Sequence, residues 1–192
     1  MEKSNILTAI LITGPPGVGK TTLVRKICSK LGEQSKLQGF YTEEVRADGK
    51  GQRIGFDVVT LTGKRGILAR ERPLDNLRRP KVGKYSVYVQ DFENLTLPLL
   101  DGSHSGFGLL VIDEVGKMEL LSKRFEAAIA NVFEQQRRPI LATIPQATRQ
   151  SMPLVEKLKN APGAYIYEVT KVNRDALVNQ ITELITQSKF LT

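Results

Sequence analysis

A glycine-rich segment near the N-terminus constrains the fold more than any other part of the sequence. Residues 14–21 read GPPGVGKT and match the phosphate-loop pattern G-x-x-x-x-G-K-[S/T] in full. An apolar run at 6–12 precedes this segment, and a helical pattern at 22–27 follows it. A strand that ends in such a loop and opens a helix directs backbone N–H groups at a phosphate, at the positive end of the helix dipole. The sequence therefore predicts a phosphate-binding loop between a buried parallel strand and a helix.

The residue types in this loop predict specific contacts. Its glycines let backbone N–H groups converge on the β-phosphate, and Lys20 is expected to reach the β- and γ-phosphates. The Thr21 hydroxyl is expected to bind Mg²⁺. The nucleotide-binding candidates in and directly after the loop are Gly14, Pro15, Pro16, Gly17, Val18, Gly19, Lys20, Thr21 and Thr22. The predicted ligand is a nucleoside di- or triphosphate, with Mg²⁺ as cofactor.

Length and composition fit one compact domain over residues 1–192. The chain has 192 residues, of which 41% are hydrophobic, so it can bury a full core without disulfides or metals. The single cysteine, Cys28, cannot form an internal disulfide and indicates a reducing, cytoplasmic compartment. The apolar run at 6–12 is too short to span a membrane and has no cleavage-site pattern. We expect a monomer with no membrane attachment.

Strand and helix patterns alternate along the chain, with no repeats. Two β-rich runs around a glycine-rich turn at 48–51 predict a hairpin. The expected strands cover 6–12, 39–45, 54–61, 66–69, 85–89, 109–112, 139–143 and 164–169. Apolar residues at helical spacing predict helices after residue 22 and over 92–99, 125–133 and 177–185. The predicted fold class is α/β, a mainly parallel sheet flanked by helices, with an antiparallel excursion near 39–89.

A second motif lies about ninety residues after the phosphate loop. Residues 109–114 read LLVIDE, an apolar strand that ends in two acids. Asp113 is expected to hold Mg²⁺, directly or through water. Glu114 is expected to orient and deprotonate a water that attacks the γ-phosphate, although a kinase could use the same carboxylate on a hydroxyl. A structural alternative is an acid that favours a helix N-terminus. Thr143, which ends a predicted strand, is a further candidate contact for the γ-phosphate.

The net charge of +8 is concentrated in one segment. Residues 64–84 hold eight basic residues against two acidic ones. Such a segment could attract a second phosphorylated substrate, the triphosphate itself or nucleic acid, or it could be a solvated loop. It contains no aromatic residue before Tyr85, so it does not favour a stacking platform for nucleic acid.

Five segments together resemble the cancer-related nucleoside-triphosphatase family, the relatives of a thermophile nucleotide phosphatase. They are residues 13–23, 39–45, 53–61, 112–120 and 170–174, and the resemblance extends from about residue 8 to 178. It implies a RecA-like P-loop NTPase fold. It also implies slow Mg²⁺-dependent hydrolysis of several nucleoside triphosphates, such as ATP, GTP, CTP and UTP, to diphosphate and phosphate. The loop from Arg70 to Gly83 matches nothing in that pattern.

The segment TKVN at 170–173 is one residue away from the [NT]-K-x-D loop with which GTPases select guanine. An Asp carboxylate accepts from both guanine donors, whereas Asn173 presents one acceptor and one donor group. Lys171 and Arg174 could lie along or stack on a base. If this loop covers the base, it should accept different bases. Alternatively, Asn173 is only the N-cap of the following helix.

The leading functional hypothesis is nucleoside-triphosphate hydrolysis, with Glu114 and Lys20 as the catalytic residues. One alternative is a nucleotide or nucleoside kinase that holds its second substrate with the basic 64–84 segment. Another is a regulatory switch or an ATPase subunit that acts on a protein or nucleic-acid partner.

Overall fold

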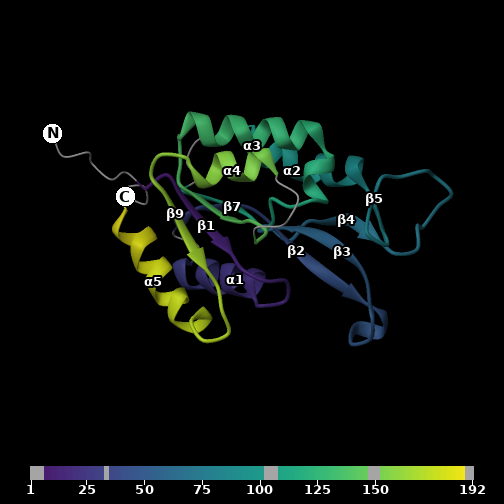
Figure 1. Cartoon of the computed structure of the whole chain (residues 1–192), viewed down its shortest axis with the longest axis horizontal. Coiled ribbons are helices and arrows are strands. Elements are labelled where there is room, and N and C mark those ends of the chain that lie inside the picture. Colours follow the sequence, from purple (N-terminus) through teal and green to yellow (C-terminus); the bar gives the residue numbers. More distant parts are fainter. Residues whose placement is uncertain (1–6, 33–34, 102–107, 147–151, 189–192) are drawn as a thin grey trace.

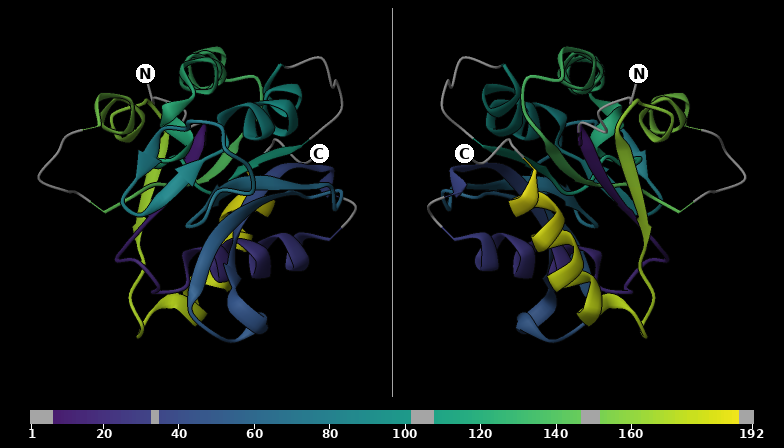
Figure 2. Two further views of the ribbon diagram at one scale, coloured as in Figure 1. Left: turned by 90° about the vertical axis from the view of Figure 1, so that its right-hand side faces the viewer. Right: turned by 90° about the vertical axis from the view of Figure 1, so that its left-hand side faces the viewer.

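The computed structural model describes residues 7–32, 35–101, 108–146 and 152–188 of the chain. Helices α2, α3 and α4 lie on one face of a central sheet, and helices α1 and α5 lie on the other (Figure 1). Figure 2 shows the sheet between these two helical layers from both ends. None of the described helices is long and apolar enough to cross a membrane.

The strands are β1 (Ala9–Thr13), β2 (Leu37–Arg46), β3 (Arg53–Thr60), β4 (Arg65–Arg70), β5 (Lys81–Val82), β6 (Tyr85–Val87), β7 (Leu109–Ile112), β8 (Ile140–Thr143) and β9 (Ala164–Glu168). The α-helices are α1 (Lys20–Leu31), α2 (Val89–Leu100), α3 (Lys123–Gln135), α4 (Pro153–Lys159) and α5 (Arg174–Gln187). Two 3₁₀ turns, η2 (Ala47–Gly49) and η3 (Glu119–Leu121), complete the described elements.

Nine strands form one sheet in the order β5-β6-β4-β3-β2-β7-β8-β1-β9. The pairs β2–β7, β7–β8, β8–β1 and β1–β9 are parallel. The remaining pairs, from β2 outward to β5, are antiparallel. The predicted α/β class with an antiparallel excursion is therefore confirmed. One strand, β8, separates the strand before the phosphate loop from the strand that ends in the acid pair.

The central strands are apolar throughout because helices cover both faces of the sheet. Along β7, Leu110 and Ile112 pack in the core under α2 and α3. The alternate residues, Leu109 and Val111, pack in a second core with helices α1 and α5. Because successive side chains of a strand point to opposite faces, one short strand contributes to both cores. Both helical layers are thereby fixed around the end of β7.

Most predicted elements are found, with four main differences. The two-residue strand β5 was not predicted, because it is too short to show an alternating pattern. The strand expected to start at residue 6 is described from Ala9, and residue 6 lies outside the described residues. The strand expected over 85–89 ends at Val87, because the chain turns into α2 at Val89. Helix α4 was not predicted; its seven residues are too few to establish a helical period. Pro153 at its first turn and a buried face of three aliphatic residues stabilise it.

Gly39 permits a close approach between β2 and β7. Its φ is 137°, and a Cβ atom there would lie 1.9 Å from the carbonyl oxygen of Val111. Beyond this point, Asp113 N–H donates to the Phe40 carbonyl at 3.1 Å. The close contact holds β2 against the end of β7, where the acid pair begins.

Candidate active site

The phosphate-loop residues lie between β1 and α1, as predicted. Gly14, Gly17 and Gly19 have φ values of 146°, 74° and 109°, which side-chain-bearing residues rarely adopt. Helix α1 begins at Lys20, and the Lys20 Nζ donates to the Gly14 carbonyl at 3.0 Å. Val18 is buried and anchors the loop in the α1–α5 core. Pro15, Pro16, Gly17 and Thr22 are exposed, whereas Gly19, Lys20 and Thr21 are partly exposed.

Asp113 lies buried at the end of β7, beside the end of β8 and the middle of β2. Its Oδ1 accepts a hydrogen bond from the Thr143 hydroxyl at the end of β8. Thr143, proposed above as a γ-phosphate contact, thus binds the acid directly. Burial raises the pKa of the Asp113 carboxyl, and the nearby hydroxyls of Thr143 and Thr21 oppose this shift. The tertiary structure therefore brings Thr21 and Asp113 together, as the metal prediction required.

This group of residues fits a divalent cation. The Asp113 Oδ2 atom is buried and has no hydrogen-bond partner in the structure, which is costly for a carboxylate unless a cation or water satisfies it. Within the described part of the chain, no three His, Cys, Asp or Glu side chains are arranged to hold a metal by themselves. A cation held by Thr21 and Asp113 would therefore complete its shell with phosphate oxygens and water, as Mg²⁺ commonly does.

Glu114 follows Asp113 directly and is partly exposed, unlike its buried neighbour. Burial raises the pKa of the Glu114 carboxyl; the Lys20 charge lowers it and the Asp113 charge raises it further. Both groups therefore lie within electrostatic range of Glu114. A carboxylate with a raised pKa beside a phosphate-binding lysine is a suitable proton acceptor.

A third acid, Glu119 of η3, lies next to this pair and was not among the predicted site residues. It is buried, and Gly116 N–H donates to its Oε2 at 3.1 Å. Burial and the nearby Glu114 carboxylate raise the pKa of Glu119 to about 8. Glu119 lies within the segment 112–120 that the sequence analysis singled out. Its closeness to Glu114 depends on the turn after β7, which the sequence pattern does not show.

The loop between β9 and α5 lies beside the phosphate loop, and Arg174 connects the two. Arg174 Nη1 is 3.4 Å from the Val18 carbonyl and 3.7 Å from the Cβ position of Gly19. The Asn173 amide is bonded inside its own loop: its Oδ1 accepts from Thr170 N–H at 2.8 Å and its Nδ2 donates to the Glu168 carbonyl at 2.9 Å.

The N-cap interpretation of Asn173 is therefore wrong in its chemistry. The residue occupies the cap position of α5, but its side chain makes no capping hydrogen bond to the helix. It folds back toward β9 instead. Lys171 is exposed in the same loop. The structure thus places Lys171, Asn173 and Arg174 near the phosphate loop through one short connection.

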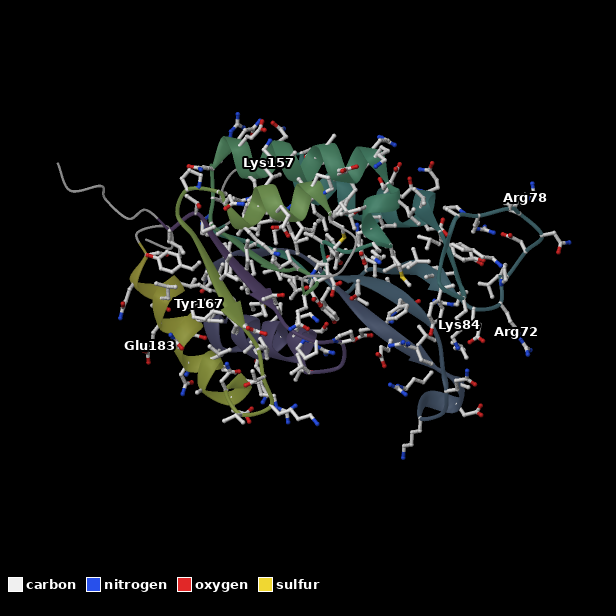
Figure 3. All side chains as sticks on the ribbon, in the orientation of Figure 1. Arg72, Arg78, Lys84, Lys157, Tyr167 and Glu183 are labelled. Atoms are coloured by element: carbon white, nitrogen blue, oxygen red, sulfur yellow. The ribbon has the colours of Figure 1, made fainter. Side chains whose placement is uncertain are left out.

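The basic 64–84 segment lies away from the phosphate loop. Strands β3, β2, β7 and β8 separate β4 from β1, and Figure 3 shows Arg72 and Arg78 at the outer tip of the molecule. Much of its charge is paired: Arg65 and Arg70 bind Asp57 at 2.8 and 2.5 Å, Lys84 binds Glu71 at 2.7 Å, and Arg79 pairs with Asp75. None of these ion pairs involves a phosphate-loop residue.

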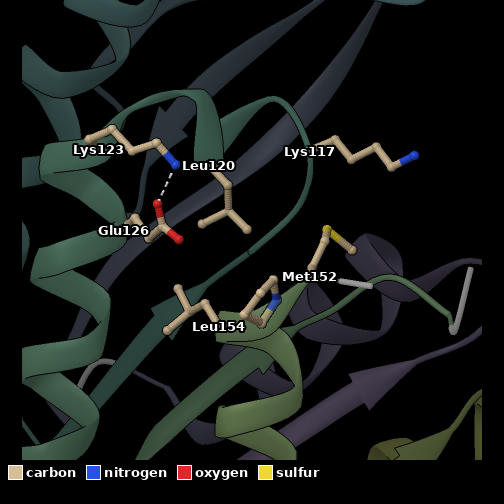
Figure 4. Close-up of a pocket in the computed structure, with 7 residues that line it drawn as sticks. Lys117, Leu120, Lys123, Glu126, Met152 and Leu154 are labelled. Atoms are coloured by element: carbon tan, nitrogen blue, oxygen red, sulfur yellow. Dashed lines mark hydrogen bonds and ion pairs between the residues drawn. The ribbon is translucent and has the colours of Figure 1, made fainter. Parts of the chain in front are cut away.

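A small cleft opens beside the turn after β7 (Figure 4). It has a volume of about 230 Å³, below the range usual for ligand pockets. Its lining residues are Lys117, Leu120, Lys123, Glu126, Met152, Pro153 and Leu154. Lys123 and Glu126 form an ion pair at 2.7 Å in its wall. No residue of the phosphate loop lines this cleft, so it is separate from the site above.

His104, a conspicuous lone histidine, lies outside the described residues.

The fold and the loop together define a phosphate-loop NTPase of the α/β class. Comparison with known proteins agrees, because the sequence matches the NTPase family over residues 9–182. The nucleoside-triphosphatase THEP1 of Thermotoga sp. (strain RQ2) is 44% identical over 177 residues, which cover 92% of this chain and 94% of that protein.

Two solved structures are similar to this chain over nearly its whole length. The crystal structure of THEP1 from Aquifex aeolicus has a TM-score of 0.79 and 38% identity, covering 93% of this chain and 99% of that one. The solution structure of a human cancer-related nucleoside triphosphatase also has a TM-score of 0.79, with 42% identity and coverage of 94% and 98%. The chain belongs to this NTPase family. The resemblance inferred from the five sequence segments is confirmed, and these relatives give no support to the kinase alternative.

Proposed function

We propose that this protein hydrolyses nucleoside 5′-triphosphates to diphosphate and phosphate, with Mg²⁺ as cofactor. The observation that carries the proposal is the convergence of Lys20, Thr21, Asp113 and Glu114 at the ends of β1 and β7. The Thermotoga and human relatives described above are named nucleoside-triphosphatases, which supports the same reaction. We further propose that one domain, acting as a monomer on free nucleotides, is sufficient for it.

Phosphate binding follows from the loop between β1 and α1. Backbone N–H groups at the start of α1 hold the β-phosphate, and the Lys20 ammonium bridges the β- and γ-phosphates. Thr21 and Asp113 would hold the cation, whose charge would offset that of the phosphate oxygens. Thr143 keeps the Asp113 carboxylate in place through its hydroxyl.

Hydrolysis requires a water to attack the γ-phosphorus and the bond from that phosphorus to the β–γ bridging oxygen to break. Glu114 accepts the proton that the water loses, so a new P–O bond forms without a free hydroxide ion. Lys20 stabilises the negative charge that develops on the leaving diphosphate. The partial exposure of Glu114 leaves room for the water.

We propose broad base tolerance, with ATP, GTP, CTP and UTP all accepted. The amide oxygen and nitrogen of Asn173 each bond to the backbone of their own loop, so this side chain is engaged before any base arrives. A GTPase-type carboxylate, which would select guanine, is missing at position 173. The aliphatic part of Lys171 and the guanidinium group of Arg174 can pack against the face of any base. Such contacts do not depend on the hydrogen-bond donors and acceptors at the edge of the base.

The direct test is phosphate release from each of the four triphosphates, with Mg²⁺ and with excess chelator. We expect release from all four, with rates within about tenfold of one another, and loss of release in chelator because the metal shields the phosphate charge. A kinase would instead release little phosphate until an acceptor was added. That result, or hydrolysis of one triphosphate alone, would contradict the proposal.

A further inference from the structure

Glu119 is linked to the turn that carries Glu114. The chain leaves β7 at Ile112 and reaches Gly116 two residues after Glu114. Gly116 N–H donates to Glu119 Oε2, and Leu120 N–H donates to the Gly116 carbonyl at 3.0 Å. Both hydrogen-bonding groups of Gly116 are therefore held by η3. The backbone on either side of Glu114 is held by the sheet, because Asp113 N–H donates to the Phe40 carbonyl at 3.1 Å and Val115 N–H donates to the Thr143 carbonyl at 2.9 Å. The Gly116 bonds add a second attachment, from η3, at the other end of the same turn.

Gly116 also provides the space in which two carboxyl groups meet. A Cβ atom at this position would lie 2.6 Å from Glu114 Oε1 and 3.0 Å from Glu119 Oε2. Gly116 is not among the glycines with positive φ, so its backbone does not require glycine. Glycine is required at position 116 for a steric reason, because the carboxyl groups of Glu114 and Glu119 occupy the space that a Cβ atom would take.

We propose that Glu119 is a positioning residue for hydrolysis, which aims Glu114 at the attacking water by holding the 113–116 turn through Gly116. This inference rests on the proposed function, because Glu114 is the group that is positioned. It assigns Glu119 no contact with nucleotide; the residue acts through the turn.

The electrostatics of Glu119 agree with such a role. Burial and the Glu114 and Asp113 carboxylates raise the pKa of Glu119 to about 8, a shift that favours the protonated side chain. A neutral carboxyl group still accepts from Gly116 N–H and leaves the negative charge with its neighbours. Glutamine has the same shape, is neutral and keeps the acceptor oxygen. It should therefore replace Glu119, whereas alanine should not.

The experiment measures kcat and KM for Mg²⁺-ATP hydrolysis by four variants of the full chain. For Glu119→Ala and Gly116→Ala we expect kcat to fall roughly 10- to 100-fold with KM within about threefold, because a small misplacement of a catalytic group has effects of this size. Glu119→Gln should stay within about threefold of the unmodified protein. Lys117→Ala, an exposed change in the same turn, is the matched control and should leave both constants unchanged.

Unchanged kcat in Glu119→Ala would overturn the inference, and so would a Glu119→Gln variant as impaired as Glu119→Ala. If Glu119→Ala does not fold, as a melting curve would show, Gly116→Ala decides: normal kcat there also overturns it. Glu114→Gln is measured in parallel. Full activity in Glu114→Gln would refute the proposed role of Glu114 itself, whereas loss there with normal Glu119→Ala refutes only the inference about Glu119.

Discussion

The two neighbouring acids at the end of β7 have different surroundings, which fit the different roles proposed for them. Asp113 is buried, bonded to Thr143 and left with one free oxygen, which suits a metal ligand. Glu114 is partly exposed and lies within the field of Lys20, which suits proton transfer. The order of the two acids after the strand predicts these roles from the sequence. The burial and the partners of each side chain in the structure are consistent with that prediction.

Cys28 of α1 illustrates a residue whose chemistry the fold suppresses. Burial, aided by the Asp113 charge, raises the pKa of its thiol from 9.0 to about 12. Alkylation by iodoacetamide at pH 8 should thus be much slower in the folded protein than in denaturant, because the thiolate is the reacting form. Because the folded state favours the protonated thiol, this group's contribution to stability is complete below pH 9 and is lost toward pH 12. Equal alkylation rates in folded and unfolded protein would contradict this account.

At the scale of elements, the site depends on how closely β2 approaches β7. Gly39 lies at the contact, and beyond it β2 continues as an antiparallel partner of β3. Helix α1 is joined to this extension by the Arg25–Glu43 ion pair at 3.0 Å. The strand that ends in the acid pair and the helix that opens at Lys20 thus share β2 as a common neighbour.

Gly39→Ala should destabilise the fold by at least about 2–3 kcal/mol, since the new methyl group collides with the Val111 carbonyl and the φ is strained. Gly63→Ala is the matched control: its φ is 87°, but no atom lies within 4 Å of the Cβ position. That variant should lose only about 1–2 kcal/mol, the cost of the left-handed conformation alone. Urea denaturation of both variants measures the difference. Similar losses of unfolding free energy in the two variants would mean that the close approach of β2 to β7 does not decide the cost at Gly39.

Features that depend on local sequence could be predicted, and those that depend on long-range contacts could not. The loop at 14–21, the strand before Asp113 and the hairpin around 48–51 each have a short, self-contained pattern. By contrast, the Thr143–Asp113 bond joins residues 30 apart in the chain, and the short helix α4 forms because its aliphatic face finds a core. The orientation of the Asn173 amide toward β9 is a detail of loop geometry that no residue pattern encodes.

For the whole molecule, the candidate site lies at the C-terminal ends of the inner strands β1, β7 and β8, between the two helical layers. The basic segment extends the sheet on the far side and pairs with acids of the hairpin, so the positive net charge is not concentrated at the phosphate site. A nucleotide bound at the loop would instead contact α1, the end of β7 and the β9–α5 connection. These parts come from the sheet and from the α1–α5 layer, so binding should stabilise the folded chain as a unit.

Thermal unfolding with and without nucleotide tests this coupling. A nonhydrolysable triphosphate with Mg²⁺ at about 100 times its dissociation constant should stabilise the protein by roughly 2.7 kcal/mol. Chelation of the metal should remove most of this gain, and Lys20→Ala should abolish it by removing the bridge between β- and γ-phosphates. Nucleotide stabilisation that persists undiminished in Lys20→Ala would indicate binding elsewhere.

The most direct test of the central claim is the rate of the chemical step in Glu114→Gln. Glutamine keeps the size and hydrogen-bonding reach of glutamate but cannot take a proton from water. In single-turnover experiments with Mg²⁺-ATP, we predict nucleotide affinity within about threefold of the unmodified protein and a hydrolysis rate lower by roughly 10²–10⁴-fold. Hydrolysis within about threefold of the unmodified rate would contradict the account, because the water would then be activated by a group other than Glu114.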